Sequence, residues 1–292
     1  MKIITSPKCL EYDHPGYPEN SDRVRLTLEY LKAKKDSYGV DFEFIEPKPC
    51  APEDILLVHT SAMVDKVRTG SFTDPDIYNM PGIYDISLLS AGAAVLAAET
   101  ALQEGAQSTR SASFSLMRPP GHHATKSHSG GFCYFNNIAI ASKKILLSGK
   151  GPVAILDFDC HHGNGTQNIM MGKDGVLFIS LHQIPLYPGT GLRSEKNCIN
   201  FPLPPGTSEK QYLSALEQAL KEIEKFNPAV IAVSAGFDAY KEDTITQMSL
   251  EVESYKKIGN MIKSLNKPRF ALLEGGYSPQ LPECVYSFIS GF

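Results

Sequence analysis

The sequence predicts a single α/β domain with a central, mostly parallel sheet covered by helices on both faces. Short runs of apolar and β-branched residues alternate along the 292 residues with longer segments whose apolar residues recur at helical spacing. Hydrophobic residues make up 42% of the chain, which is enough to build a large core. No repeat, low-complexity tract or composition shift marks a boundary, so residues 1–292 are predicted to be one domain.

Five elements are predicted in the first part of the chain. Apolar and β-branched runs predict strands, and apolar residues three or four positions apart predict helices. The helix over 85–105 is so rich in alanine that we expect it to be buried among its neighbours. In order, the elements are a strand over 2–6, helices over 22–34, 53–69 and 85–105, and a strand over 111–117.

The second part continues the alternation. Ser208 is the predicted N-cap of the helix over 208–226, and the Pro-Pro-Gly in "NFPLPPGTSEK" (200–210) predicts a loop before it, inside the domain. The predicted strands are 152–159, 176–182, 229–236 and 269–276, and the predicted helices are 135–149, 166–171, 208–226, 250–266 and the C-terminus.

Charge and cysteine usage exclude several classes of function. The formal net charge of −4 gives no electrostatic reason to expect nucleic acid or an anionic membrane as a partner. The N-terminus has no apolar segment typical of a signal peptide, and we expect no stretch of membrane-spanning length. The six cysteines form no C-x-x-C pair, so we expect a reducing, cytoplasmic setting, with Cys133 and Cys160 as packing residues. The sequence predicts no oligomeric state.

Polar side chains gather at one end of five predicted strands. In α/β sheets ligands bind at the carboxyl edge, so we expect these segments to converge on one site. A set of surface loops would instead place polar residues at both strand ends, whereas the amino ends carry mostly Gly, Pro, Lys and Asn. In strand order the residues are His122 and His123; Asp157, Asp159, His161 and His162; Ser180 and His182; Asp238; and Glu274 and Tyr277.

The stretch "LDFDCHHGNGTQ" (156–167) predicts a metal site. Asp157, Asp159 and His161 alternate, which places them on one face of a strand, where they would repel one another without a cation. One histidine with two aspartates, Asp238 being the second, would leave Zn²⁺ an open position, as in catalytic sites. D-x-D-x-H alone is also compatible with a Mg²⁺ or Mn²⁺ phosphoesterase, or with a hydrogen-bonded strand end.

Two further motifs suggest amide hydrolysis. The pair His122 and His123 offers a base whose ordinary pKa lies near neutrality. Tyr277 follows two glycines, so its phenol can be placed over a carbonyl oxygen. The chain lacks G-x-G-x-x-G after a strand, a P-loop and G-x-S-x-G, which disfavours dinucleotide, ATP and serine-hydrolase chemistry.

The motifs resemble one family over nearly the whole chain. "RPPGHHA", "GFCYFNN", "LDFDCHHGNGTQ", "LYPGTG", "SAGFDA" and "LEGGY" are similar, in this order, to the histone deacetylase and acetylpolyamine amidohydrolase family, which has the arginase–deacetylase fold. The Asn in "HHGNG" is closer to its class II members. The resemblance implies that Asp159, His161 and Asp238 bind Zn²⁺, with Fe²⁺ as an alternative ion. It also implies that His123 is the general base and acid and His122 its electrostatic partner.

The resemblance assigns roles to the neighbouring residues as well. Asp157 falls where the family hydrogen-bonds the first histidine, Asn164 where it bonds the second, and Tyr277 where it polarises the acetyl carbonyl. Arg23 resembles a residue near an internal acetate exit. The expected structural K⁺ site comprises Asp157, Asp159, His161, Ser180 and Leu181, and the expected substrate tunnel is lined by Gly131, Phe132, Tyr187 and Ile245.

Three positions depart from the family pattern. Tyr187 replaces the usual Phe of one tunnel wall, and Tyr17 stands where a His is usual. Ile245 aligns with a gatekeeper that is acidic in polyamine-selective relatives, which weakens the case for polyamine selectivity by that device.

The sequence therefore predicts zinc-dependent removal of acetyl groups from N-acetylated amines, with acetyl-lysine peptides or proteins as the expected substrates. An acetylpolyamine or other small acylated amine is the alternative within the enzyme class. An inactive acyl-lysine binder and a two-metal, arginase-like or phosphoester hydrolase are alternatives from other classes.

Overall fold

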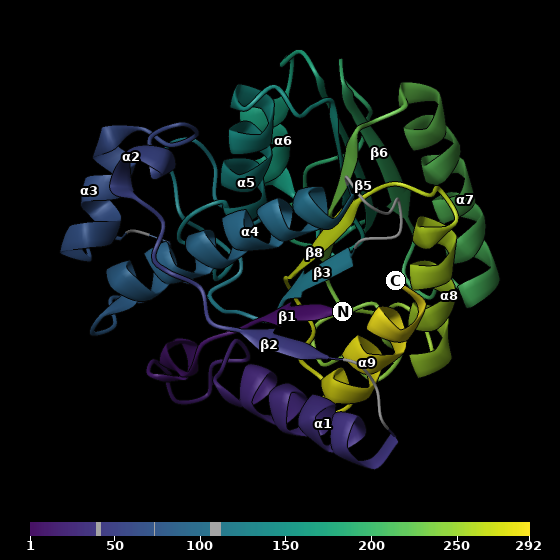
Figure 1. Cartoon of the computed structure of the whole chain (residues 1–292), viewed down its shortest axis with the longest axis horizontal. Helices are drawn as coiled ribbons and strands as arrows, with labels where there is room; N and C mark the ends of the chain where they lie inside the picture. Colours follow the sequence, from purple (N-terminus) through teal and green to yellow (C-terminus); the bar gives the residue numbers. More distant parts are fainter. Residues whose placement is uncertain (39–41, 73, 106–111) are drawn as a thin grey trace.

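The computed structural model describes residues 1–38, 42–72, 74–105 and 112–292, and their strands form one eight-stranded, fully parallel sheet (Figure 1). The spatial order is β2-β1-β3-β8-β7-β4-β5-β6, so the last strand in the chain lies in the middle of the sheet. The prediction of a mostly parallel sheet is confirmed. The strands are β1 (Lys2–Ile4), β2 (Glu43–Ile45), β3 (Ala112–Ser115), β4 (Val153–Asp157), β5 (Val176–Gln183), β6 (Cys198–Leu203), β7 (Val230–Ala235) and β8 (Arg269–Leu273).

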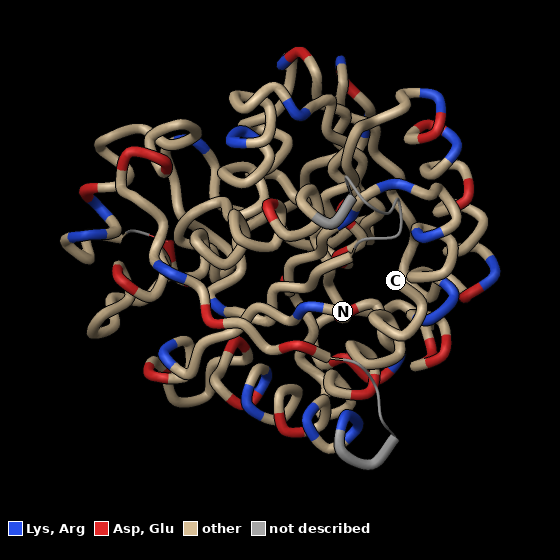
Figure 2. The backbone as a smooth tube through the Cα atoms, viewed as in Figure 1, with Lys and Arg blue, Asp and Glu red and all other residues tan. Residues whose placement is uncertain are grey.

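Helices cover both faces of the sheet, as predicted. α4, α5 and α6 contact the strands on one face, while α1, α9, α8 and α7 form a continuous layer on the other (Figure 1). Lys and Arg are interspersed with Asp and Glu along the outer helices (Figure 2). The helices are α1 (Asp22–Tyr38), α2 (Pro52–Ile55), α3 (Ser61–Thr69), α4 (Ile83–Gly105), α5 (Asn137–Leu147), α6 (Asn164–Met170), α7 (Glu209–Phe226), α8 (Val252–Lys263) and α9 (Leu281–Gly291), with a 3-10 turn at Pro7–Leu10.

The central strands are buried along their whole length. Every residue of β4, β5, β7 and β8 is buried, which explains why these segments are mostly apolar. At about 25 cal/mol per Å² of apolar surface, this core supplies the main driving force for folding. It also gives the site at the strand ends a rigid base.

Two sequence predictions need correction, and one strand was not predicted. The single helix predicted over 53–69 is two helices, because Thr60 caps α3 and its backbone N–H bonds to Lys126 O, 2.9 Å away, instead of continuing a helix. Part of the loop predicted over 200–210 belongs to the strand β6. Because β6 is an edge strand, its proline leaves no neighbouring strand without a hydrogen-bond donor. The strand at the opposite edge, β2, has only three residues, which are too few to show an alternation of apolar and polar side chains.

The long helix α4 is buried, as expected, but it contradicts the expectation that no apolar stretch reaches membrane-spanning length. Its Ile83–Gln103 stretch, 21 residues with a mean hydropathy of 1.4, is long and apolar enough to cross a membrane. It is nevertheless a core helix, since 72% of its most apolar window is buried inside the fold. Gly92 allows a close approach to the chain before α2, where a Cβ would lie 1.9 Å from Lys48 O. The alanine-rich sequence therefore reflects tight packing on the sheet and on α5.

Candidate metal centre and active site

The five strands with polar carboxyl ends are neighbours in the sheet, in the order β3-β8-β7-β4-β5. Asp157, the last residue of β4, pairs in register with Ser180 of β5 on one side and Ser234 of β7 on the other. Side chains from segments far apart in sequence therefore meet at one edge of the sheet, as the pattern of polar residues predicted.

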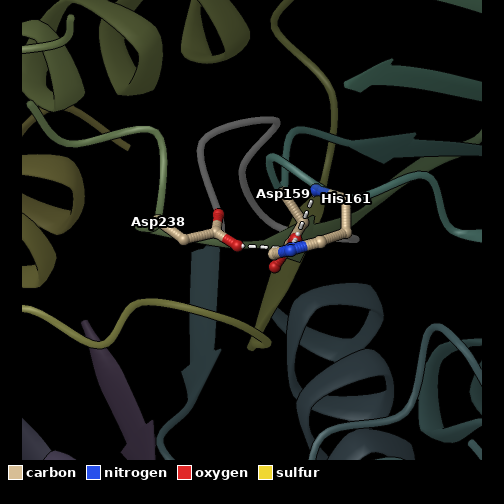
Figure 3. A group of neighbouring side chains, drawn as sticks. All are labelled: Asp159, His161 and Asp238. Carbon is tan, nitrogen blue, oxygen red and sulfur yellow. Dashed lines mark hydrogen bonds and ion pairs between the residues drawn. The ribbon is translucent and has the colours of Figure 1, made fainter. Parts of the chain in front are cut away.

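Asp159, His161 and Asp238 converge just beyond this edge (Figure 3). Nδ1 of His161 lies 2.7 Å from Asp238 Oδ2 and 3.1 Å from Asp159 Oδ1. All three side chains are buried, and their potential ligand atoms lie within 4.8 Å of one another. Backbone N–H groups hold the outer carboxylate oxygens: Gly275 donates to Asp159 Oδ2 at 2.7 Å and Cys160 to Asp238 Oδ1 at 2.8 Å.

The chemistry of this donor set fits a divalent cation. In the described part of the chain, neither carboxylate pairs with a Lys or Arg. Burial, reinforced by the charge of Asp159, raises the pKa of Asp238, whereas Asp159 is equally buried but has its pKa lowered by the adjacent His122 and His161. Two carboxylates and an imidazole around an open position are typical of catalytic zinc.

Two glycines are required beside the carboxylates. A Cβ at Gly236 would lie 2.1 Å from Asp159 Oδ2. A Cβ at Gly275 would lie 2.6 Å from the same oxygen and 2.7 Å from Asp238 Oδ2. The backbone thus approaches the donor atoms too closely for any side chain.

The adjacent histidines have different partners. Nδ1 of His122 lies 3.0 Å from Asp157 Oδ2, and Nδ1 of His123 lies 2.7 Å from Asn164 Oδ1. Burial opposes a charge on His122, but the neighbouring carboxylates outweigh it and raise its pKa to about 10. Burial lowers the pKa of His123, and the charges of neighbouring histidines lower it further. The surroundings therefore favour the cationic form of His122 and the neutral form of His123.

A cavity of about 230 Å³ opens onto these residues. The ring of Tyr187 stands edge-on to His123 at 5.0 Å, and Phe132 stands edge-on to Tyr277 at 5.8 Å. The Tyr277 hydroxyl has no hydrogen-bond partner among the described residues, so it is available to a ligand. The lining residues are Asp76, His123, Gly131, Phe132, His161, Leu186, Tyr187, Ile245 and Tyr277.

All four predicted tunnel residues line this cavity. Two lining residues, Asp76 and Leu186, were not among the predicted site residues. Asp76 could have been found from the acidic stretch "DPD" at 74–76, whereas no sequence pattern pointed to Leu186. Tyr17, which stands where a His is usual in the family, packs edge-on against Phe132 at 4.7 Å, and its hydroxyl donates to the backbone carbonyl of Asp76.

A buried ionic network underlies the site. Arg118 is fully buried, and Glu19 accepts from its Nε and Nη2 at 2.8 and 2.9 Å. Glu19 also accepts from Arg23 at 3.1 Å, and Arg23 in turn donates to Gly276 O at 2.7 Å, just before Tyr277. Sequence reasoning noted Arg23 but missed Glu19 and Arg118, because isolated charged residues give no sign of being buried.

The remaining conspicuous histidine is structural. Nδ1 of His162 lies 2.8 Å from Thr190 Oγ1, and its Nε2 lies 2.9 Å from Gln167 Oε1. Its ring packs 4.6 Å from that of His182, whose Nε2 is 3.1 Å from Gly191 O. These contacts fix the loop that carries Tyr187.

Comparison with known proteins assigns the family. The histone deacetylase domain model matches residues 17–292. A probable deacetylase of Methanothermobacter thermautotrophicus is 40% identical over 96% of this chain and 86% of its own length. An acetylpolyamine amidohydrolase of Burkholderia pseudomallei is 37% identical, over 68% of this chain and 60% of its own length.

Solved structures give the same result. The HDA15 HD domain superposes with a TM-score of 0.90 at 29% identity, covering 99% of this chain and 87% of that one. The acetylpolyamine aminohydrolase of Burkholderia pseudomallei superposes with a TM-score of 0.84 at 28% identity, covering 100% and 98%. On its sequence, its fold and the matched domain, the chain belongs to the histone deacetylase and acetylpolyamine amidohydrolase family.

Proposed function

We propose that the chain hydrolyses the amide bond of N-acetylated amines, with Zn²⁺ held by Asp159, His161 and Asp238. The observation that carries this proposal is the meeting of three elements at one cavity: the buried Asp–His–Asp group, the His123 ring held by Asn164, and the Tyr277 phenol, which has no hydrogen-bond partner in the described chain. Zinc bound there would supply a Lewis acid that polarises the amide carbonyl and lowers the pKa of a bound water.

The chain's own residues supply the proton transfers. Because Asn164 Oδ1 accepts from Nδ1 of His123, the neutral ring keeps its lone pair on Nε2, which has no partner among the described residues. We assign this nitrogen to take a proton from the attacking water and to return it to the leaving amine. His122, held by Asp157, supplies positive charge beside it.

Tyr277 has a separate role. Its hydroxyl donates a hydrogen bond to the acetyl oxygen as negative charge develops there, while Phe132 and Tyr187 hold the alkyl stem and exclude water. A structural K⁺ at Asp157, Asp159, His161, Ser180 and Leu181 belongs to the same proposal, since these residues lie on or directly after the adjacent strands β4 and β5.

The test compares Tyr277→Phe with Tyr30→Phe, a control on α1 outside the cavity. Loss of one preorganised oxyanion donor costs roughly 10²- to 10³-fold in kcat. Tyr277→Phe should therefore keep its zinc, measured by mass spectrometry, but lose most deacetylation, whereas Tyr30→Phe should match the wild type. Near-normal activity of Tyr277→Phe would refute the proposed role of the Tyr277 hydroxyl.

Acetyl-lysine peptide is the first proposed substrate, and an acetylated polyamine is the second. The second is supported by an acidic rim: Asp76 lines the cavity, Asp74 Oδ1 accepts its backbone N–H at 2.9 Å, and no Lys or Arg in the described chain pairs with either. A second ammonium group, as in a polyamine substrate, would pair with the carboxylates of this rim. The apolar Ile245 lacks the acidic character of polyamine-selective relatives. Parallel kcat/KM values for acetyl-lysine peptide and acetylated putrescine or spermidine decide between them.

The same measurements test the other classes. Tight binding of acetyl-lysine peptide without turnover by the metal-loaded protein would indicate an inactive binder. Two Mn²⁺ per chain and no zinc would indicate a two-metal hydrolase.

A further inference from the structure

Tyr277 lies in a glycine-rich loop whose own backbone is too flexible to fix the direction of the tyrosine side chain. The residues before it are Gly275 and Gly276, and Gly276 has a φ of 118°, a conformation open mainly to glycine. The Tyr277 hydroxyl has no partner in the described chain. The direction of the phenol must therefore be set by contacts to the loop backbone and to the ring.

Four hydrogen bonds hold this backbone in the described chain. Phe237 N–H donates to Gly275 O at 3.0 Å. Gly275 N–H donates to Asp159 and Arg23 donates to Gly276 O, each at 2.7 Å. The fourth bond is the only one among the described residues that reaches the tyrosine backbone itself: Tyr277 N–H donates to Asp243 Oδ2 at 2.7 Å.

Asp243 is placed to serve two loops at once. Its side chain is almost fully buried, and its other oxygen accepts the N–H of Ile245 at 3.1 Å. Tyr277 and Ile245 both line the catalytic cavity. A single carboxylate thus connects two cavity walls that are 32 positions apart, and in the described chain it has no Lys or Arg partner.

We propose that Asp243 is a positioning residue, which fixes the phenol of Tyr277 relative to the substrate carbonyl through the Tyr277 backbone. This inference rests on the proposed function of Tyr277. Charge-assisted hydrogen bonds of this kind are about twice as strong as neutral ones, which suits a contact that must hold a glycine-rich loop.

The experiment is a double-mutant cycle of Asp243→Asn with Tyr277→Phe. Misplacement of a catalytic group by about 1 Å costs up to roughly 10²-fold. We expect Asp243→Asn to lower kcat by roughly 10-fold with little change in KM and in zinc content. In the Tyr277→Phe background the same substitution should change kcat by less than about twofold, because the group that it positions is gone.

Glu242→Gln is the matched control, since this neighbour is exposed and makes no hydrogen bond in the described chain. A crystal structure of Asp243→Ala should show the Tyr277 ring displaced, and that of Glu242→Gln should not. Equal losses of kcat in both backgrounds, or an undisturbed ring in Asp243→Ala, overturn the inference. An inactive wild type with a displaced ring in Asp243→Ala would instead refute the proposed function alone.

A second, independent observation concerns a cavity of about 470 Å³, twice the volume of the catalytic one. It lies between the α2–α3 turn, the loop after His123, and helices α5 and α6. Its apolar side is formed by residues such as Val58, Leu146 and Ile169, and Leu56 at its edge is half exposed.

The charges around this cavity have one dominant sign. Lys126, Lys143 and Lys173 line it, and none of their ammonium groups has an ion-pair partner in the described chain, against a single carboxylate at Asp174. His59 adds no charge, because burial lowers its pKa to about 4. This cluster is unusual on a chain with a net charge of −4.

We infer that the cavity binds a small amphipathic anion. Its acidic group pairs with the three lysines, and its apolar part packs against Val58, Leu146 and Ile169. The volume lies within the range of ligand pockets. Octanoate is the probe, and octanol, which lacks the charge, is its comparison.

Calorimetric titration of the metal-loaded protein should detect octanoate and not octanol. Lys143→Glu with Lys173→Glu should weaken octanoate binding by at least about 10-fold, the equivalent of roughly 1.4 kcal/mol. Lys210→Glu with Lys263→Glu, on α7 and α8 across the sheet, should leave it unchanged. Equal binding of octanol, no octanoate binding, or equal effects of both charge reversals would overturn the inference.

Discussion

Replacing Glu19 with Gln should destabilise the protein far more than replacing a similar exposed glutamate. The Glu19 side chain is 1% exposed and accepts hydrogen bonds from both Arg118 and Arg23, as well as from the Tyr12 hydroxyl at 2.9 Å. Glutamine keeps the shape but loses the charge, and its NH₂ group would face donors. Breaking a buried pair from one side costs about 3–5 kcal/mol, because the other charge remains buried and loses its main partner. Arg118 would keep only the partly exposed Asp13, 3.3 Å away, and backbone carbonyls.

Glu29→Gln provides the control. Glu29 contacts Arg25 at 3.1 Å on the surface of α1, with 60% of its side chain exposed, so its loss should cost about 0–1 kcal/mol. Urea unfolding followed by circular dichroism measures both variants. With a slope of roughly 3 kcal/mol per M, Glu19→Gln should lower the midpoint by about 1 M or more. A shift equal to that of Glu29→Gln would refute the argument that this network is a buried ionic centre.

The same variant predicts a pH dependence. Burial alone would raise the pKa of Glu19, but the charge and hydrogen bonds of Arg118 outweigh it, so the pKa is lowered in the folded state. A lowered pKa stabilises the fold above the unfolded-state value of about 4.3 and loses this effect as the pH falls through the folded-state value. The difference in stability between wild type and Glu19→Gln should therefore be constant near neutral pH and shrink below about pH 4.

Three further predictions concern the site. Gly275→Ala places a methyl group against Asp159 and Asp238, so zinc affinity in a chelator competition should fall roughly 10- to 100-fold, and unchanged affinity would contradict the close approach. Asn164→Ala removes the 2.7 Å contact to His123 and should lower kcat by roughly 10-fold with zinc retained; equal kcat would remove the orienting role. Stripping the metal with a chelator should lower the unfolding temperature, measured by calorimetry, and adding zinc should restore it.

Much of the fold followed from sequence because the central strands are buried on both faces. Continuous apolar runs such as residues 153–156 have no other simple interpretation when helical segments separate them. The edges were harder to predict. β2 is only three residues long, and β6 contains a proline, so both depend on pairing with a neighbour already in place. The break between α2 and α3 depends on tertiary bonds at His59 and Thr60, which no local pattern specifies.

The candidate site divides in a similar way. Residues adjacent to a strand end, such as Asp159 and His161, were recognisable because a spacing of two on a strand places them together. Asp243 and Glu19 were not, because their roles arise from backbone groups and arginines that are distant in sequence. A lone carboxylate in a loop has the same local appearance whether it is solvated or buried.

The central position of β8 has a consequence for synthesis of the chain. Until residues 269–273 have emerged from the ribosome, the sheet consists of two separate parts, β2-β1-β3 and β7-β4-β5-β6, each with an open edge that the last strand must close. The nascent chain therefore exposes one side of β3 from residue 115 onward, and one side of β7 from residue 235 onward, until β8 is made. Such unpaired edges favour aggregation. A chain that ends before Arg269 should accumulate as insoluble material, not as a partly active enzyme.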